Sequence, residues 1–170
     1  MSNIELIVLS LIHEKPSYAY EIDKQIEARK MRLWVKVGIA SIYQVLERLE
    51  HKGYVEFRVE REGKAPERKR YFITETGKSE LKNAVQEALV KLEWYYLDLN
   101  VAIEGSDILE EGELRACLEQ RLQKVRHSLE RLREDYGREM LRSTKSEAIM
   151  RSVMLFREAE ERLLSELISR

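Results

Sequence analysis

Apolar and polar positions in the middle of the chain recur with a helical period. Ile42, Val45, Leu46 and Leu49 follow the i, i+3, i+4, i+7 spacing of one buried stripe. The opposite face of the same segment carries the hydrogen-bonding side chains of Ser41, Tyr43, Gln44, Glu47, Arg48 and His51. Gly53 follows, and glycine there tolerates the left-handed conformation that ends a helix. The pattern predicts a helix with one buried face and one polar face.

The period changes from helical to extended after that glycine. Apolar and charged residues alternate over 54–60, and a second run, rich in aromatic and β-branched residues, covers 69–74. Between the two runs, Gly63 and Pro66 are typical loop residues. Helix, strand, loop and strand in this order are the layout of a winged helix-turn-helix. In that layout the helix enters a DNA major groove and the hairpin reaches the flanking backbone.

Two further helices are predicted ahead of this segment. A densely apolar stretch over 4–12 has the composition of a helix at the centre of a small helical domain. Ser17 is a favourable N-cap for the next helix, which is expected to run from Tyr18 and to bury Ile22 and Ile26.

The C-terminal half carries longer apolar stripes. Thr74 is expected to cap one helix whose stripe runs from Leu81 to Leu99 and on toward Ile103. A second stripe has the a/d spacing of a coiled coil and consists of Leu118, Leu122, Val125, Leu129, Leu132 and Tyr136. A last helix is expected to place on one face Ile149, Val153, Phe156, Leu163 and Leu167.

Two arrangements can bury these apolar stripes: an antiparallel bundle within one chain, or a dimerisation arm between two copies. The apolar seams of these helices are too narrow to fill a bundle core alone, which favours the dimerisation arm. Helix-turn-helix modules also commonly bind DNA as symmetric pairs. The sequence thus predicts a mostly α fold with a small β-hairpin wing. A winged helix-turn-helix DNA-binding domain is expected at 1–80 and a helical dimerisation domain at 81–170. The expected interface of the homodimer comprises Leu118, Leu122, Val125, Leu129, Phe156 and Leu163.

Charge is distributed unevenly along the chain. The 170 residues have a formal net charge of −1, which by itself does not suggest a nucleic-acid partner. Between Arg58 and Arg70, however, six basic residues stand against three acidic ones. Positive charge therefore gathers at the loop that would face DNA phosphates.

Other classes of function find no support in the sequence. His13, His51 and His127 are scattered without partners at ligand spacing, so no metal site is expected. Neither a glycine-rich phosphate loop nor a nucleophile motif occurs, so neither an enzyme nor a cofactor is expected. A single cysteine, Cys117, suits a reducing cytosol. With no signal peptide and no bilayer-spanning run, a cytoplasmic location without a membrane partner is expected.

Eleven positions of the central segment also share the pattern of a known family. They are Ser41, Ile42, Tyr43, Leu46, Arg48, Leu49, Glu50, Gly53, Tyr71, Thr74 and Gly77. This stretch, SIYQVLERLEHKGYV followed by a basic hairpin and YFITETG, resembles the PadR family of transcriptional regulators. It departs from that pattern at Gln44, where many members have proline, and at Glu67 in the wing. The resemblance implies C-terminal helices that interlock two subunits.

The protein is expected to regulate transcription as a dimeric repressor that binds an inverted-repeat operator. The expected contacts to double-stranded DNA are Tyr18, Lys36, Ser41, Tyr43, Gln44, Arg48, Lys64, Arg68, Lys69 and Arg70. Gln44 can pair with adenine, and the wing cations can neutralise phosphates. For Arg48, an ion pair with the neighbouring Glu47 or Glu50 is an equal alternative.

Two further interpretations stay open. The alternative to DNA binding is a winged-helix module that binds protein. Its support comes from the acidic residues of this region, Glu47, Glu50, Glu56, Glu60 and Glu62. Trp94 and Tyr95 either pack in the dimer interface, where aromatic residues are common, or line a pocket between subunits. The resemblance implies a small aromatic or amphiphilic effector for such a pocket, whose binding releases DNA.

Overall fold

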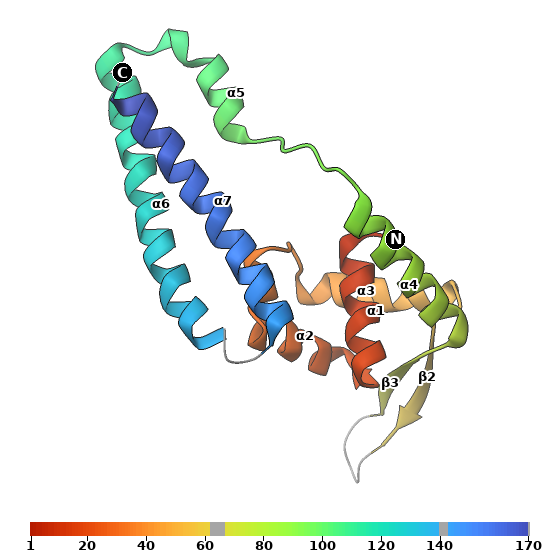
Figure 1. Ribbon diagram of the computed structural model, residues 1–170. Helices are drawn as coiled ribbons and strands as arrows, with labels where there is room; N and C mark the ends of the chain where they lie inside the picture. The colour runs from red at the N-terminus through yellow and green to blue at the C-terminus, as the bar shows by residue number, and fades with distance from the viewer. Residues whose placement is uncertain (62–66, 140–142, 170) are drawn as a thin grey trace. The chain divides into compact units, whose positions relative to one another are not determined.

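The computed structural model describes residues 1–61, 67–139 and 143–169. The chain forms two units, Met1–Glu93 and a second that begins at Trp94. Each unit has its own hydrophobic core. Most of the described chain is helical and one small sheet forms the wing, so the predicted fold class is confirmed (Figure 1).

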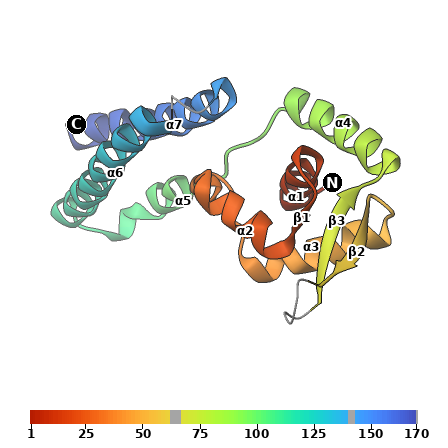
Figure 2. The same cartoon turned by 90° about the horizontal axis from the view of Figure 1, so that it is seen from below.

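The first unit has the element order of a winged helix-turn-helix. Its elements are α1 (Asn3–Glu14), β1 (Ser17–Tyr18), α2 (Ala19–Ala28), the 3-10 helix η1 (Met31–Leu33), α3 (Ile39–His51), β2 (Val55–Glu60), β3 (Arg68–Ile73) and α4 (Glu75–Val90). The three strands pair antiparallel in the order β1-β3-β2. Figure 2 shows the β2–β3 hairpin extending beside α3.

Two predicted element ends are confirmed. Gly53 has φ of +71°, the left-handed conformation that lets the chain turn from α3 into β2. The Thr74 hydroxyl accepts a hydrogen bond of 2.9 Å from the N–H of Gly77, so Thr74 caps α4.

The predicted start of the second helix is wrong by one residue. Ser17 does not cap it, because its hydroxyl donates to the Lys15 carbonyl and the residue belongs to β1. Tyr18 is the N-cap, and the Glu21 carboxylate accepts the Tyr18 N–H at 3.0 Å. The pairing of Ser17 with β3, which is distant in sequence, thus outweighs the preference of serine for an N-cap position.

The core of the first unit gathers around α1, as the sequence predicts. Helices α2, α3 and α4 and strand β3 all pack against α1. The fully buried side chains of this core are Val8, Leu9, Leu11, Ile12, Ile22, Ile26, Ile42, Val45, Leu46 and Leu49. The apolar stripe of α3 therefore faces inward and leaves its polar face free for a ligand.

The long helix predicted over 74–103 is not continuous. Helix α4 ends at Val90, residues 91–97 are not helical, and α5 covers Asp98–Glu104. Leu81 is buried in the first core and Ala84 is also buried, whereas Leu89 is 80% exposed. The helix thus ends soon after it leaves the core that stabilises it. Because neither glycine nor proline marks this end, the apolar spacing alone suggested one helix.

The second unit is a pair of long helices with α5 beside them. Helix α6 covers Glu111–Glu139, α7 covers Thr144–Ile168, and the 3-10 helix η2 covers Ser106–Ile108. Both views show α6 and α7 side by side (Figures 1 and 2). Ion pairs join them, with Arg121 at 2.6 Å from Glu160 and Arg126 at 2.9 Å from Glu161.

The coiled-coil seam of α6 is covered within the chain. Leu122, Val125 and Leu129 are buried in one cluster with Leu99 of α5 and Leu164 of α7. The sequence interpretation assigned this seam to a second copy, but a seam of this spacing packs equally well against a helix of the same chain. Here the bundle arrangement supplies the burial that the arm interpretation assigned to a dimer.

The apolar stripe predicted for the last helix is turned relative to the observed one. The buried residues of α7 are Met150 and Leu164. Phe156 is 54% exposed and Leu163 is 38% exposed in the single chain. Helix α7 therefore buries one face against α6 and presents Phe156 and Leu163 away from that contact.

A buried carboxylate ties α1 to the end of α3. Glu5 is 5% exposed, accepts the N–H of Ser2 at 2.8 Å, and lies 2.9 Å from the Lys52 ammonium and 3.6 Å from Arg48 Nε. Burial opposes ionisation of Glu5, but the hydrogen bonds from Ser2 and Lys52 outweigh it and lower its pKa to about 2. The ionised carboxylate is thus part of the stable fold.

We expect Glu5→Gln to lower the free energy of unfolding by about 3 kcal/mol at pH 7, because a pKa lowered from 4.5 to about 2 corresponds to that amount. This contribution is complete above pH 4.5 and is lost as the pH falls toward 2. Denaturant unfolding of both proteins at pH 7 and pH 3 measures it. The difference between wild type and variant should shrink at pH 3, and an unchanged difference would contradict the assignment to Glu5.

Candidate nucleic-acid interface

The exposed face of α3 carries polar side chains, and the start of this helix favours anions. Tyr43 is 51% exposed and Gln44 is also exposed, while Ile42 and Val45 beside them are fully buried. The first turn of α3 holds no acidic residue, and its N-cap, Gly38, has no side chain to cap it. The positive end of the helix dipole is therefore not neutralised locally and favours anions.

Two predicted contacts flank the start of α3. Ser41 is half-buried in the first turn, and its N–H donates to the Gly38 carbonyl at 3.1 Å. Lys36 is exposed in the segment between η1 and α3. Arg32 holds this segment, because its Nε donates to the Val37 carbonyl at 3.1 Å. Both predicted residues thus lie next to the exposed start of α3.

Arg48 is engaged by an ion pair, although not by the partners the sequence suggested. Its Nε lies 3.6 Å from Glu5 of α1, and its side chain remains 55% exposed. The sequence had left an ion pair with Glu47 or Glu50 of the same helix as an equal alternative to a DNA contact. The contact with α1 directs Arg48 toward the body of the unit, and the exposed half of its side chain is the part that can still reach DNA.

The described wing cations that were predicted to contact DNA lie on β3. Arg68 and Lys69 are exposed, and Arg70 is half-buried. The Lys69 ammonium lies 3.8 Å from the centre of the Phe57 ring and 3.8 Å from the Glu50 carboxylate of α3. The contact with Glu50 joins the wing to α3. Lys64, also predicted to contact DNA, lies outside the described residues.

Tyr18 joins the wing through β1, a contact that the sequence did not reveal. It pairs with Arg70 in the sheet, and its hydroxyl donates a hydrogen bond of 2.6 Å to Glu60 at the end of β2. Its ring stacks on Tyr20, with centroids 5.6 Å apart. The pKa of Tyr18 is raised, chiefly by the hydrogen bond to Glu60. A strand of two residues has no period of its own, so only the sheet pairing reveals it.

Part of the acidic charge in this region is already paired. Glu50 lies near Lys69, and Glu60 lies 3.4 Å from Arg70. Glu47 and Glu56 are exposed. The carboxylates that favoured a protein-binding module are thus in part internal partners of the wing cations, which weakens that interpretation.

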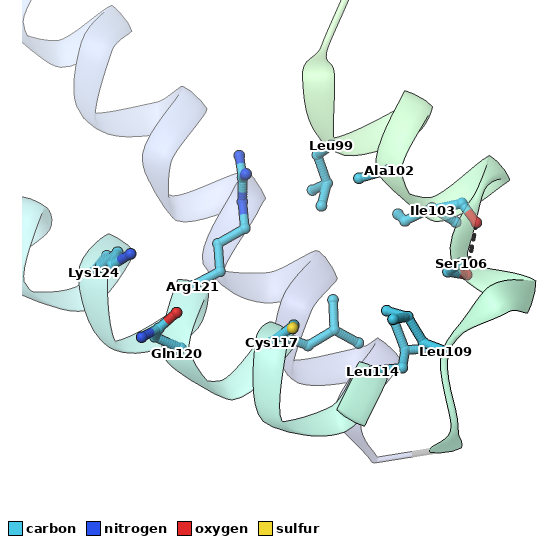
Figure 3. Close-up of a pocket in the computed structure, with 11 residues that line it drawn as sticks. Leu99, Ala102, Ile103, Ser106, Leu109, Leu114, Cys117, Gln120, Arg121 and Lys124 are labelled. Atoms are coloured by element: carbon cyan, nitrogen blue, oxygen red, sulfur yellow. Dashed lines mark hydrogen bonds between the residues drawn. The ribbon is translucent and has the colours of Figure 1, made fainter. Parts of the chain in front are cut away.

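The two residues predicted to bind an effector lie outside any helix. Trp94 is 80% exposed, and Tyr95 is 64% exposed with its ring 5.3 Å from that of Phe156 on α7. Neither lines the hollow of about 350 Å³ beside α5 and α6 (Figure 3). Leu99 and Cys117 are among the residues around that hollow.

The predicted interface residues fall into two groups. Leu122, Val125 and Leu129 are buried and Leu118 is half-buried on the seam between α6 and its neighbours. Phe156 and Leu163 are exposed on α7. The structure thus brings together the α6 residues within one chain and leaves the α7 residues open.

Two other kinds of site receive no support. Among the described residues, no three His, Cys, Asp or Glu side chains gather in the manner of metal ligands. No helix in the described part of the chain is long and apolar enough to cross a membrane.

Known proteins share both the sequence pattern and the fold. Residues 8–83 match the transcriptional regulator PadR-like family. A relative in Lysinibacillus sphaericus, uncharacterized protein X, is 35% identical over 85 residues, which are 50% of this chain and 77% of that protein.

Solved structures extend the likeness beyond the winged unit. Bacillus subtilis PadR in complex with operator DNA has a TM-score of 0.83 at 18% identity, over 99% of this chain and 98% of that one. The same protein in complex with p-coumaric acid has a TM-score of 0.79 at 16% identity, over 98% and 96%. At these identities the likeness shows a common fold. Together with the family match and the relative, it identifies this chain as a member of the PadR-like family of transcriptional regulators, which are DNA-binding proteins and not enzymes.

Proposed function

We propose that this protein represses transcription by binding an inverted-repeat operator as a homodimer. One observation carries the proposal: the exposed polar face of α3 and the cationic strand β3 belong to one unit and are joined by Lys69 and Glu50. In this arrangement Tyr43 and Gln44 read the bases, because they are exposed on the helix that enters the groove. Arg68 and Lys69 neutralise phosphates and thereby fix the position of the protein along the duplex.

The other predicted contacts support this division of roles. Lys36 and Ser41 lie at the start of α3, where phosphates are favoured by the helix dipole. Arg48 contributes a second cation on the exposed face, shared with Glu5. Tyr18 and Arg70 form the base of the wing, where a tyrosine hydroxyl and a guanidinium are both donors for a phosphate oxygen.

Exposed apolar side chains support a homodimer. Leu155, Phe156 and Leu163 are exposed on α7, and the end of α4 with the segment that follows it exposes a further series: Leu89, Val90, Leu92, Trp94, Tyr96 and Leu97. Large apolar side chains exposed in such number mark an interaction site. A second copy is the partner that fits, because two equal subunits match the two halves of an inverted repeat. We therefore assign the interface to the exposed residues of the second unit, Phe156 and Leu163 first.

A small aromatic ligand is proposed to release the protein from DNA. Support comes from the exposed rings of Trp94 and Tyr95, one of which contacts Phe156, and from the p-coumaric acid bound to a protein of the same fold. Such a ligand acts only if it binds the released form more tightly than the DNA-bound form. If it binds at the dimer interface, it can alter the spacing of the two reading helices.

We expect p-coumaric acid to quench Trp94 and to weaken DNA binding over the same concentration range. Fluorescence of Trp34→Phe, which retains Trp94, follows the ligand, and Trp94→Phe is the matched control. Anisotropy of a labelled duplex follows the DNA. Release of DNA with no change at Trp94 would place the ligand elsewhere, and no effect on either signal would contradict this effector.

Binding to DNA across salt concentrations tests the proposed function. Full-length protein should bind duplex DNA at low salt, and the logarithm of its affinity should fall linearly with the logarithm of salt concentration, by about 0.9 for each phosphate contact. A winged module that binds only protein would show no binding to any DNA duplex, even at low salt. That result would favour the protein-binding alternative.

A further inference from the structure

A carboxylate of the wing lies between two residues assigned to DNA. The Tyr18 hydroxyl donates a hydrogen bond of 2.6 Å to Oε2 of Glu60, and Arg70 Nη1 lies 3.4 Å from the same oxygen. Tyr18 belongs to β1, Glu60 to β2 and Arg70 to β3. All three strands of the sheet thus meet at one carboxylate oxygen.

The surroundings of this oxygen are those of an anion site. The Arg70 guanidinium lies 5.2 Å from the centre of the Tyr18 ring. Tyr18 stacks on Tyr20, and Arg68 and Lys24 approach the Tyr20 ring at 5.3 Å and 5.4 Å. The cations of β3 and α2 therefore lie along a pair of stacked rings, and an acidic side chain of the protein occupies the donors at one end.

We propose that Glu60 competes with the DNA backbone for the Tyr18 hydroxyl and the Arg70 guanidinium. In the free protein the carboxylate holds both donors, and when DNA binds, a phosphate oxygen takes its place. A carboxylate and a phosphate are both anionic acceptors for these groups, so the donors exchange one for the other. The inference rests on the proposed use of the wing for DNA binding.

The competition has a defined effect on affinity. Glu60 remains close to the phosphate that displaces it, and its charge opposes that phosphate. Because phosphate contacts are independent of sequence, the carboxylate lowers affinity for every duplex to the same extent. The base contacts of α3 are not changed by it, so preference among sequences stays the same. Glu60 thereby limits the time that the protein spends on non-specific DNA.

Replacing Glu60 with glutamine tests the inference, because Glu60→Gln removes the charge and keeps an oxygen that can accept from Tyr18. We expect affinity for a random duplex to rise by about threefold to tenfold, with a salt slope steeper by about 0.9 per subunit, equal to one phosphate contact. Glu56→Gln is the matched control, since Glu56 is an exposed carboxylate on the same strand that bonds to neither donor. It should change affinity less than twofold.

A second variant separates competition from positioning. Glu60→Ala removes the acceptor as well as the charge, and under competition it also binds more tightly than wild type. If Glu60 instead orients Tyr18 and Arg70 for DNA, Glu60→Ala binds more weakly and the inference is overturned. The Glu60 side chain is 38% exposed, so both variants should fold and the thermal unfolding temperature should change little. The inference can therefore be tested with either variant. A wild-type protein that binds no duplex contradicts the proposed function, whereas binding that Glu60→Gln does not strengthen contradicts only this inference.

Discussion

Alanine at Arg68, Lys69 and Arg70 together should weaken binding to every duplex by about two to three orders of magnitude at about 0.1 M salt. The three cations lie in succession on β3, where a hairpin beside the reading helix meets the phosphate backbone. The salt slope should become shallower by about 0.9 for each phosphate that the variant no longer neutralises. Anisotropy of a labelled duplex over a series of salt concentrations measures the affinity and the slope together.

Gln44→Ala is the matched control for the wing variant. Gln44 is exposed on α3, so its replacement should change which base is preferred and leave affinity for random DNA within about twofold. Both proteins should unfold at the same temperature as wild type. If the wing variant changed sequence preference and Gln44→Ala weakened general affinity, the reading and positioning surfaces would have been assigned the wrong way round.

A protein that ends at Glu93 should be monomeric and should bind a two-site operator about a hundredfold to ten-thousandfold more weakly than the full chain. The first unit keeps its own core, including Leu9, Ile42 and Leu46, so it should fold. It no longer has the link that makes binding to the second half-site intramolecular. Light scattering gives its mass, and anisotropy gives its affinity for one half-site and for two.

Phe156→Ala with Leu163→Ala in the full chain is the control for the truncation, because it changes the proposed interface and keeps the second unit. Both residues are exposed on α7, so the double variant should keep its fold and form a weaker dimer. Leu129→Ala should instead lower stability by about 2–5 kcal/mol, because Leu129 is buried in the core of the second unit. A truncated protein that stayed dimeric would contradict the assignment of the interface to the second unit.

Residues close together in sequence made the reading unit predictable. The spacing of Ile42, Val45, Leu46 and Leu49 predicted the buried face of α3, and those side chains are fully buried. Gly53 predicted the turn into the wing. A helical or extended period needs only neighbouring residues to be visible, so these elements follow from local pattern.

Contacts between distant segments escaped prediction. Strand β1 has two residues and exists only through its pairing with β3. Glu60 and Glu5 have partners 42 and 47 residues away in Tyr18 and Lys52, which no local spacing indicates. These contacts decide which charges near α3 and the wing are free, so the electrostatics of the interface required the structure.

The helices beyond Leu81 were predicted to be amphipathic, and their apolar seams were assigned to a second copy of the chain. The spacing of Leu122, Val125 and Leu129 predicts a seam, and a helix of either the same chain or a second copy can fill it. Helix α7 fills it here. The end of α4 at Val90 has no glycine or proline to mark it, and it comes where the helix no longer has a core to pack against.

Selection of DNA from a genomic library by the full-length protein tests the central claim most directly. Two exposed α3 faces in a symmetric dimer should enrich an inverted repeat, with half-site centres about one helical turn apart or a multiple of it. The enriched sequence should lose preference at one position in each half when Gln44→Ala is used. Enrichment of no sequence, or of a single half-site without a repeat, would contradict the account of a dimer that reads DNA through α3.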